Sequence, residues 1–140
     1  MFKIYKNDDE LAKNLALEIL INLKKNKKLV LGCPGGRSLK KTYYYLGKLS
    51  HELKISLDKL VIIMMDEYAI KHKGKFKLIN PKSHYSCVRF STQVIKKLLN
   101  YKKNNSHSLK LENILFPDIN NPENYDKQIK KLGGIDIFLL

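Results

Sequence analysis

The sequence predicts an α/β fold in which helices flank a parallel sheet. Short apolar runs at Leu29–Cys33 and at residues 60–65 are typical of strands buried on both faces, as parallel strands usually are. Segments with apolar residues at helical spacing lie between such runs, and this alternation favours parallel strands joined by right-handed helical crossovers. With 140 residues the chain is long enough to form one core, so we expect a single Rossmann-like domain over residues 1–140.

The N-terminal elements follow from local patterns. Residues 2–5 alternate in polarity and predict a short strand. Asp8 and Asp9 then offer an N-cap to a long amphipathic helix. After the strand at Leu29–Cys33, we expect Ser38 to cap a second helix.

The later elements are predicted in the same way. The lysine-rich residues 71–77 interrupt the hydrophobic pattern and predict a loop, after which a helix begins near Ser83. Residues 109–116 are expected to be extended, and Pro122 marks the first turn of another helix. The apolar residues 134–140 predict a last strand, so the full order is β-α-β-α-β-α-β-α-β. Because the chain stops within or just after that strand, we expect a truncated sheet and a partial domain.

The net charge of +14 arises mainly from lysine. Only Arg37 and Arg89 are arginines, so lysines supply 25 of the 27 basic residues. Dedicated nucleic-acid modules favour Arg forks and aromatic residues interleaved with the basic ones, and neither arrangement stands out in this sequence. We therefore predict no specific nucleic-acid partner, whereas the charge itself would attract polyanions and small phosphorylated compounds.

Membrane, secreted and metal-binding classes are also disfavoured. No run approaches the roughly 18 apolar residues that cross a bilayer, so no membrane partner is expected. Cys33 and Cys87 form no C-x-x-C pair and the N-terminus does not resemble a signal peptide, which favours a reduced, cytoplasmic protein. Three histidines lack partners at metal-ligand spacing, so no metal site is predicted: His51, His72 and His107.

A glycine-rich turn follows the first buried strand. It consists of Gly35, Gly36, Arg37 and Ser38. Glycines allow backbone N–H groups to approach an anion, and a helix N-terminus adds partial positive charge. The composition therefore suits a phosphate. A plain strand-to-helix turn is the alternative, because neither G-x-G-x-x-G nor the P-loop pattern is present.

Two carboxylates, Asp66 and Glu67, follow the second buried strand. Ligands and reactive groups of α/β proteins gather at the carboxyl ends of such strands. The apolar residues before Asp66 would bury it in part, which suits a general base. In the alternative interpretation both carboxylates are solvated at the start of a loop.

Three ordered motifs together resemble those of one enzyme family. Residues 31–39 read L-G-C-P-G-G-R-S-L, residues 65–68 read M-D-E-Y, and residues 80–86 read N-P-K-S-H-Y-S. They resemble the L-G-x-P-T-G-G-T-P, M-D-E-Y and H-P-E-S-Y-x-S motifs of the glucosamine-6-phosphate deaminases, whose more distant relatives are the 6-phosphogluconolactonases. Tyr68 favours the deaminases, because lactonases usually carry D-E-R at the second motif.

The resemblance implies that the glycine turn holds the phosphate of a phosphorylated amino sugar. Gly36 and Ser38 keep the family pattern, whereas Gly35 stands in place of a threonine and Arg37 in place of a glycine. Arg37 is either an added phosphate partner, through its bidentate fork, or a side chain that crowds the turn.

The other two motifs imply the catalytic and substrate-binding residues. Asp66 corresponds to the base that moves a proton between C1 and C2 of the opened sugar. Glu67 and Tyr68 would shape the site, and Ser83 and Tyr85 would border the substrate. The segment between the second and third motifs exceeds the usual family spacing by the lysine-rich loop.

The implied function is conversion of glucosamine 6-phosphate and water to fructose 6-phosphate and ammonia in amino-sugar metabolism, without a cofactor. The family motif G-x-G-x-D-G-H, to which ring opening is assigned, is absent from residues 1–140, so we expect this chain alone to be a poor enzyme. The alternatives are a 6-phosphogluconolactonase-like sugar-phosphate hydrolase and a noncatalytic remnant that binds sugar phosphates or polyanions. The family also suggests a homo-oligomer, and an unfinished sheet could instead associate through its exposed edge. His84 is interpreted as a helix-start residue rather than an acid or base.

Overall fold

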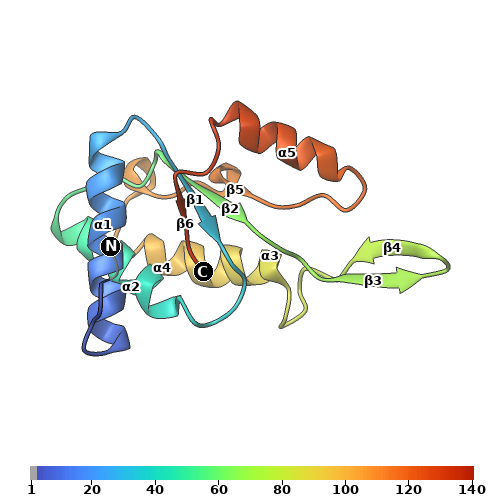
Figure 1. The fold of residues 1–140 in the computed structure, drawn as a ribbon, viewed down its shortest axis with the longest axis horizontal. Helices are drawn as coiled ribbons and strands as arrows, with labels where there is room; N and C mark the ends of the chain where they lie inside the picture. Colours follow the sequence, from blue (N-terminus) through green and yellow to red (C-terminus); the bar gives the residue numbers. More distant parts are fainter. Residues whose placement is uncertain (1–2) are drawn as a thin grey trace.

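The computed structural model describes residues 3–140 and contains a four-stranded parallel sheet at its centre (Figure 1). The strand order is β5-β2-β1-β6. The central strands are β1 (Leu29–Cys33) and β2 (Leu60–Met64), which pair along their whole length. The outer strands β5 (Ile114–Leu115) and β6 (Ile137–Phe138) are shorter. The predicted parallel sheet is therefore confirmed.

Helices cover both faces of this sheet (Figure 1). One face carries α1 (Asp8–Lys25), α2 (Lys40–Glu52) and a continuous helical segment made of α3 (Cys87–Phe90), a π-helical turn (Ser91–Ile95) and α4 (Lys96–Leu99). The opposite face carries α5 (Pro122–Lys131), whose start at a proline was predicted. Two 3-10 turns, Asn105–His107 and Leu111–Asn113, precede β5. The layers are thus helix, sheet, helix, as expected when both faces of a parallel sheet are buried.

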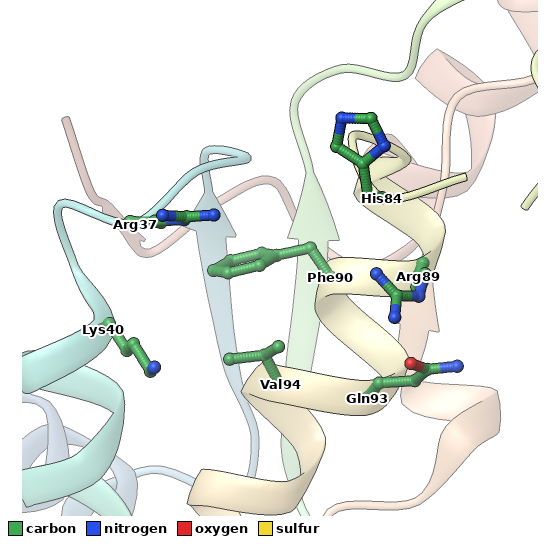
Figure 2. Close-up of a pocket in the computed structure, with 7 residues that line it drawn as sticks. All are labelled: Arg37, Lys40, His84, Arg89, Phe90, Gln93 and Val94. Atoms are coloured by element: carbon green, nitrogen blue, oxygen red, sulfur yellow. The ribbon is translucent and has the colours of Figure 1, made fainter. Parts of the chain in front are cut away.

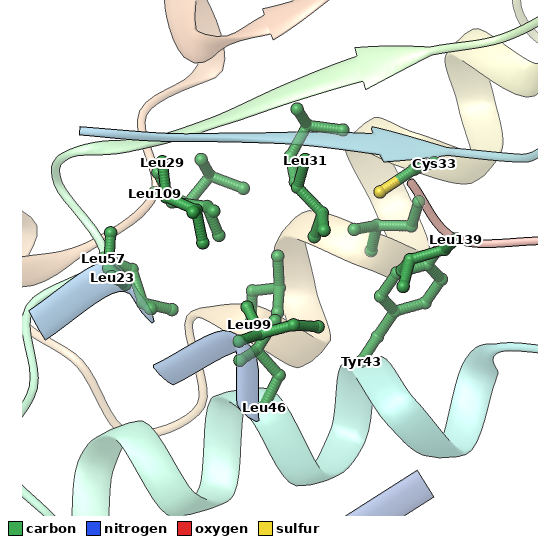
Figure 3. Close-up of a cluster of buried hydrophobic side chains, with 14 of the residues drawn as sticks. Leu23, Leu29, Leu31, Cys33, Tyr43, Leu46, Leu57, Leu99, Leu109 and Leu139 are labelled. Atoms are coloured by element: carbon green, nitrogen blue, oxygen red, sulfur yellow. The ribbon is translucent and has the colours of Figure 1, made fainter. Parts of the chain in front are cut away.

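The core divides according to the alternation of side chains along the central strands. Leu31 and Cys33 join the larger cluster, which lies against α1, α2 and α4, and Figure 3 shows Tyr43 of α2 reaching toward Cys33. Val30 belongs to the smaller cluster beneath α5, with Tyr125. Every residue of β1 and β2 is buried, which confirms the prediction from their uninterrupted apolar sequences.

A glycine allows α2 to pack closely on α4. A Cβ added at Gly47 would lie 1.9 Å from the main-chain oxygen of Leu98. A backbone atom cannot move aside as a flexible side chain can, so the spacing between these two helices requires glycine at this position.

The lysine-rich segment is a β-hairpin, and the prediction of a loop was wrong. Strands β3 (Ala69–His72) and β4 (Lys75–Leu78) pair in antiparallel register, and all of their residues are exposed. Lys73 and Gly74 both have positive φ, 47° and 77°, which is the backbone of a type I′ turn. The sequence lacked the usual Asn-Gly signal because lysine occupies the first of these positions. The hairpin extends away from the sheet (Figure 1).

The N-terminus differs from the prediction in two respects. Lys3, Ile4 and Tyr5 form no strand, and the first residue of the predicted strand, Phe2, lies outside the described residues. Helix α1 is capped by Asn7, whose side-chain oxygen accepts a hydrogen bond from the amide of Glu10. The predicted caps, Asp8 and Asp9, lie one and two positions later, in the first turn, where acidic residues interact favourably with the helix dipole.

Two later helix starts were also misplaced. Helix α2 begins at Lys40 after Leu39, with no side-chain cap, so Ser38 does not have the predicted role. Helix α3 begins at Cys87 rather than near Ser83, and the hydroxyl of Ser86 accepts the capping hydrogen bond from the amide of Arg89. Residues 109–116 are extended only in part, because a 3-10 turn precedes β5.

Candidate functional site

The glycine turn and Asp66 meet because they follow neighbouring parallel strands. Cys33 pairs with Met64 at the ends of β1 and β2, and the amide of Met65 donates a hydrogen bond to the Cys33 carbonyl. Two residues beyond the end of each strand, the amide of Gly35 donates to the Oδ1 atom of Asp66 at 3.2 Å. The first two sequence motifs therefore form one site at the carboxyl edge of the sheet, where α/β folds bind their ligands.

A cavity of about 290 Å³ opens beside this hydrogen bond. Among the predicted site residues it is lined by Gly35, Gly36, Arg37, Asp66, Tyr68 and Tyr85. We call it the Asp66 cavity. Asp66 itself is exposed, so the partial burial expected from the preceding apolar residues is not found. Its carboxylate is accessible to a ligand in this cavity.

Three predicted site residues lie outside the lining of the Asp66 cavity. Ser38 is exposed beyond the turn, and Ser83 forms a main-chain turn with Asn80 and Ser86. The third, Glu67, points toward the start of α3.

Glu67 connects the M-D-E-Y motif to α3. Its Oε2 atom accepts hydrogen bonds from the amide of Val88 at 2.8 Å and from the hydroxyl of Ser86 at 2.7 Å, while Oε1 accepts from the amide of Cys87 at 3.0 Å. The amide of Tyr68 donates to the same Oε1 atom. These groups include helix N–H groups that have no partner within the helix. Partial burial acts to raise the pKa of Glu67, but the hydrogen bonds outweigh it and hold that pKa below its ordinary value.

Aromatic side chains form one wall of the Asp66 cavity. The rings of Tyr68 and Tyr85 meet edge to face with centroids 5.6 Å apart, and the His84 ring lies 4.9 Å from that of Tyr85. Both tyrosines are about half exposed, at 53% and 50%. Their faces and hydroxyls are therefore available to a polar ring such as a sugar. His84 precedes α3 by a turn, so its interpretation as a helix-start residue was wrong, and it lines the cavity instead.

Cys87 explains why glycine occupies position 35. A Cβ at Gly35 would lie 2.6 Å from the Sγ atom of Cys87 and 3.4 Å from Oδ1 of Asp66. Burial, followed by the negative charges of Asp66 and Glu67, raises the pKa of the Cys87 thiol to about 12. The thiol therefore stays protonated near neutral pH and acts here as a small apolar neighbour.

Four further residues line this cavity and were not among the predicted site residues: His84, Ser86, Cys87 and Phe90. His84 and Ser86 belong to the third motif, whereas Cys87 and Phe90 lie in α3, just after it. The correct start of α3 is the signal that could have pointed to the last two.

Two absences hold for residues 3–140. No group of three His, Cys, Asp or Glu side chains is placed to hold a metal ion in that part of the chain. No helix there is both long enough and apolar enough to span a bilayer.

The sequence was compared with known proteins, and the similar proteins reported below are all named glucosamine-6-phosphate deaminase. No protein-family model matches the sequence. The chain is 30% identical over 137 residues to the glucosamine-6-phosphate deaminase of Mycoplasma mycoides subsp. mycoides, which covers 98% of this chain and 51% of that protein. The glucosamine-6-phosphate deaminase of Phocaeicola vulgatus is 33% identical over 114 residues, and the match covers 81% of this chain and 39% of that protein.

A solved structure agrees at the level of the fold. A monomeric glucosamine-6-phosphate deaminase, described as a missing link of the NagB superfamily, superposes with a TM-score of 0.69 at 21% identity, covering 97% of this chain and 52% of that one. The chain spans about half the length of the relatives it matches. Its fold is similar to that half of the solved structure, and along nearly its whole length its sequence is similar to part of the glucosamine-6-phosphate deaminases.

Proposed function

We propose that this chain binds a phosphorylated amino sugar and that Asp66 is the base that removes the C2 proton during deamination of glucosamine 6-phosphate. One observation carries the proposal: the amide of Gly35 donates to Asp66 Oδ1 at 3.2 Å, which joins the candidate phosphate turn and the carboxylate in one cavity. The relatives that match this part of the chain are named for that reaction.

The chemistry needs a carboxylate with one free oxygen. Once the sugar ring is open, the C1 carbonyl acidifies the C2 hydrogen, and a base within hydrogen-bond reach can remove it. The Gly35 amide fixes Oδ1 of Asp66, so Oδ2 is the oxygen left to accept this proton. Return of the proton to C1 gives an imine at C2, whose hydrolysis by water releases ammonia and fructose 6-phosphate.

The remaining predicted residues take supporting roles in this proposal. Tyr68 and Tyr85 border the sugar, and Gly36 with Arg37 faces its phosphate, since all four line the cavity. Glu67 positions the third motif by holding the first turn of α3 rather than touching the sugar. Direct contacts from Ser38 and Ser83 stay predictions.

Several finer points rest on the resemblance alone. The family motif assigned to ring opening is not among residues 1–140, so the proposal for this chain covers binding and proton transfer. A place in amino-sugar metabolism, hydrolytic release of ammonia, a cytoplasmic location and a homo-oligomeric assembly are proposed on the same basis. Cell fractionation tests the cytoplasmic location, and sedimentation tests the homo-oligomeric assembly.

Deuterium exchange tests the proposed base without requiring ring opening by the protein. Fructose 6-phosphate has an open-chain keto form in solution, and the reverse proton transfer would exchange its C1 hydrogen with solvent. We expect the protein in deuterium oxide to accelerate this exchange, as followed by proton NMR. Asp66→Asn should abolish the acceleration, whereas Asp126→Asn, at an exposed position of α5, should not.

Two results would count against the proposal. Exchange that persists in Asp66→Asn would remove Asp66 from the role of base. If the unaltered protein binds fructose 6-phosphate but gives no exchange, the catalytic part fails and the noncatalytic sugar-phosphate-binding alternative gains support.

A further inference from the structure

A second cavity, of about 260 Å³, adjoins the Asp66 cavity and is strongly basic. Its cationic side chains are Arg37, Lys40 and Arg89; His84 also lines it, and no carboxylate is among the lining residues. We call it the basic cavity. Arg37 and Lys40 come from the turn before α2 and its first residue, whereas Arg89 projects from α3 across from them (Figure 2).

These cations are not engaged by acidic residues. The ion pairs found within residues 3–140 use Lys3, Lys41 and Lys110, and none involves a cation of the basic cavity. Bringing like charges around one cavity costs free energy, unless an anion or solvent compensates them. These basic side chains are therefore not held together by ion pairs with other parts of the described chain.

The choice of arginine is informative in this chain. Of its 27 basic residues only Arg37 and Arg89 are arginines, and both line this one cavity. Lysine suffices for solubility and general attraction of anions, whereas the planar guanidinium fork matches the oxygens of a phosphate or carboxylate in a bidentate manner. The guanidinium groups of Arg37 and Arg89, which come from different elements, therefore favour recognition of a phosphate or carboxylate in this cavity.

The wall of the basic cavity has an irregular backbone. Gln93 and Val94, which line it, belong to the π-helical turn Ser91–Ile95. Such turns are rare and are frequently found at functional sites. Figure 2 shows Phe90 and Val94 extending toward Arg37 and Lys40, so that an apolar surface lies between the basic side chains.

The two cavities are adjacent, since Arg37, His84 and Phe90 line both. Asp66 lines only the first, whereas Lys40 and Arg89 line only the second. A ligand that reaches both cavities would place a carbon that carries an acidic hydrogen near Asp66 and an anionic group among the basic side chains.

We propose that the basic cavity is a phosphate-binding subsite formed by Arg37, Lys40 and Arg89. The phosphate is either the ester group of the sugar phosphate that occupies the Asp66 cavity or free inorganic phosphate bound beside it. The first source rests on the proposed function, whereas the second does not.

Titration with inorganic phosphate at constant ionic strength, followed by calorimetry or by amide NMR shifts, tests the subsite. We expect Arg89→Gln and Lys40→Gln each to weaken phosphate binding by about tenfold, the loss typical of one charge-assisted contact. Arg89→Lys, which keeps the charge but not the fork, should be weakened as well. Lys127→Gln on α5 removes the same charge from the opposite face of the sheet and should bind phosphate normally. Thermal unfolding verifies that each variant is folded.

Competition separates the two sources of phosphate. If fructose 6-phosphate displaces inorganic phosphate, the subsite holds the phosphate of the sugar; if both bind together, free phosphate is the ligand. Equal effects of Arg89→Gln and Lys127→Gln, or no saturable phosphate binding at constant ionic strength, would overturn the proposal. Phosphate binding is measured without the sugar, and hydrogen exchange is measured without added inorganic phosphate. Loss of exchange in Asp66→Asn and loss of phosphate binding in Arg89→Gln therefore report on separate proposals.

Discussion

The carboxylate of Glu67 accepts a hydrogen bond from the main-chain amide of Val88 at 2.8 Å, across 21 residues of sequence. This contact and those to Cys87 and Ser86 fasten the start of α3 to the loop that carries Asp66. The residues between Glu67 and Ser86, which include the exposed β3–β4 hairpin, form a loop that leaves the sheet and returns to it at these contacts. The second and third sequence motifs are therefore held together by one side chain.

Glu67→Gln should destabilise the protein by about 1–2 kcal/mol, because an amide cannot accept all of these hydrogen bonds and its NH₂ group faces donors. Urea unfolding measures the loss. Glu52→Gln, at an exposed position at the end of α2, is the matched control and should change stability little. Equal stability of the two variants would show that Glu67 does not anchor α3.

The low pKa of Glu67 also predicts a pH dependence of stability. Because that pKa is below its ordinary value of 4.5 in the folded protein, the unfolded chain binds a proton more readily than the folded chain does. The contribution of Glu67 is fully present above the unfolded pKa and is lost as pH falls through the folded one. Thermal unfolding from about pH 6 to about pH 3 should show a steeper loss for the unaltered protein than for Glu67→Gln. Parallel curves would contradict this.

Much of the fold was predictable because parallel strands carry a strong local signal. The runs at β1 and β2 are apolar without interruption, and α1 and α5 show clear starts. The β3–β4 hairpin was missed because all residues of its strands are exposed, so its sequence lacks the uninterrupted apolar run that marks β1 and β2. Its turn depends on Lys73 adopting a positive φ, which sequence patterns do not anticipate for lysine.

Part of the site was predictable because its residues closely follow neighbouring strands, and Tyr68 and Tyr85 were predicted through the motifs that contain them. Gly35 and Asp66 follow β1 and β2, so parallel pairing brings them together. Cys87, Arg89 and Phe90 depend on the start of α3, which the sequence placed several residues too early. The placement of α3 opposite the turn before α2 (Figure 2) depends on contacts between segments far apart in the sequence, and the basic cavity was therefore not predicted.

Gly35→Ala should destabilise the protein and displace the carboxylate of Asp66. The new methyl group would lie 2.6 Å from Cys87 Sγ, and crowding of this kind typically costs about 1–3 kcal/mol. The clash is with sulfur, so Cys87→Ala should relieve part of it in the double variant. A double-mutant cycle by urea unfolding measures the coupling. If the double variant is no more stable than Gly35→Ala, the contact with Cys87 is not what requires glycine.

Tyr125→Phe should destabilise the protein by about 1 kcal/mol, because the Tyr125 hydroxyl donates a buried hydrogen bond of 2.6 Å to the main-chain oxygen of Met64. Met64 ends β2 two residues before Asp66, so loss of this contact should also speed amide hydrogen exchange at that strand end. Tyr43→Phe is a matched control. Its buried hydroxyl lies beside the weakly accepting sulfur of Cys33 and has no hydrogen-bond partner within residues 3–140, so its removal should change stability little. A larger loss in Tyr43→Phe than in Tyr125→Phe would reverse this assignment and would show that the Tyr125 hydroxyl does not anchor α5 to the carboxyl edge of the sheet.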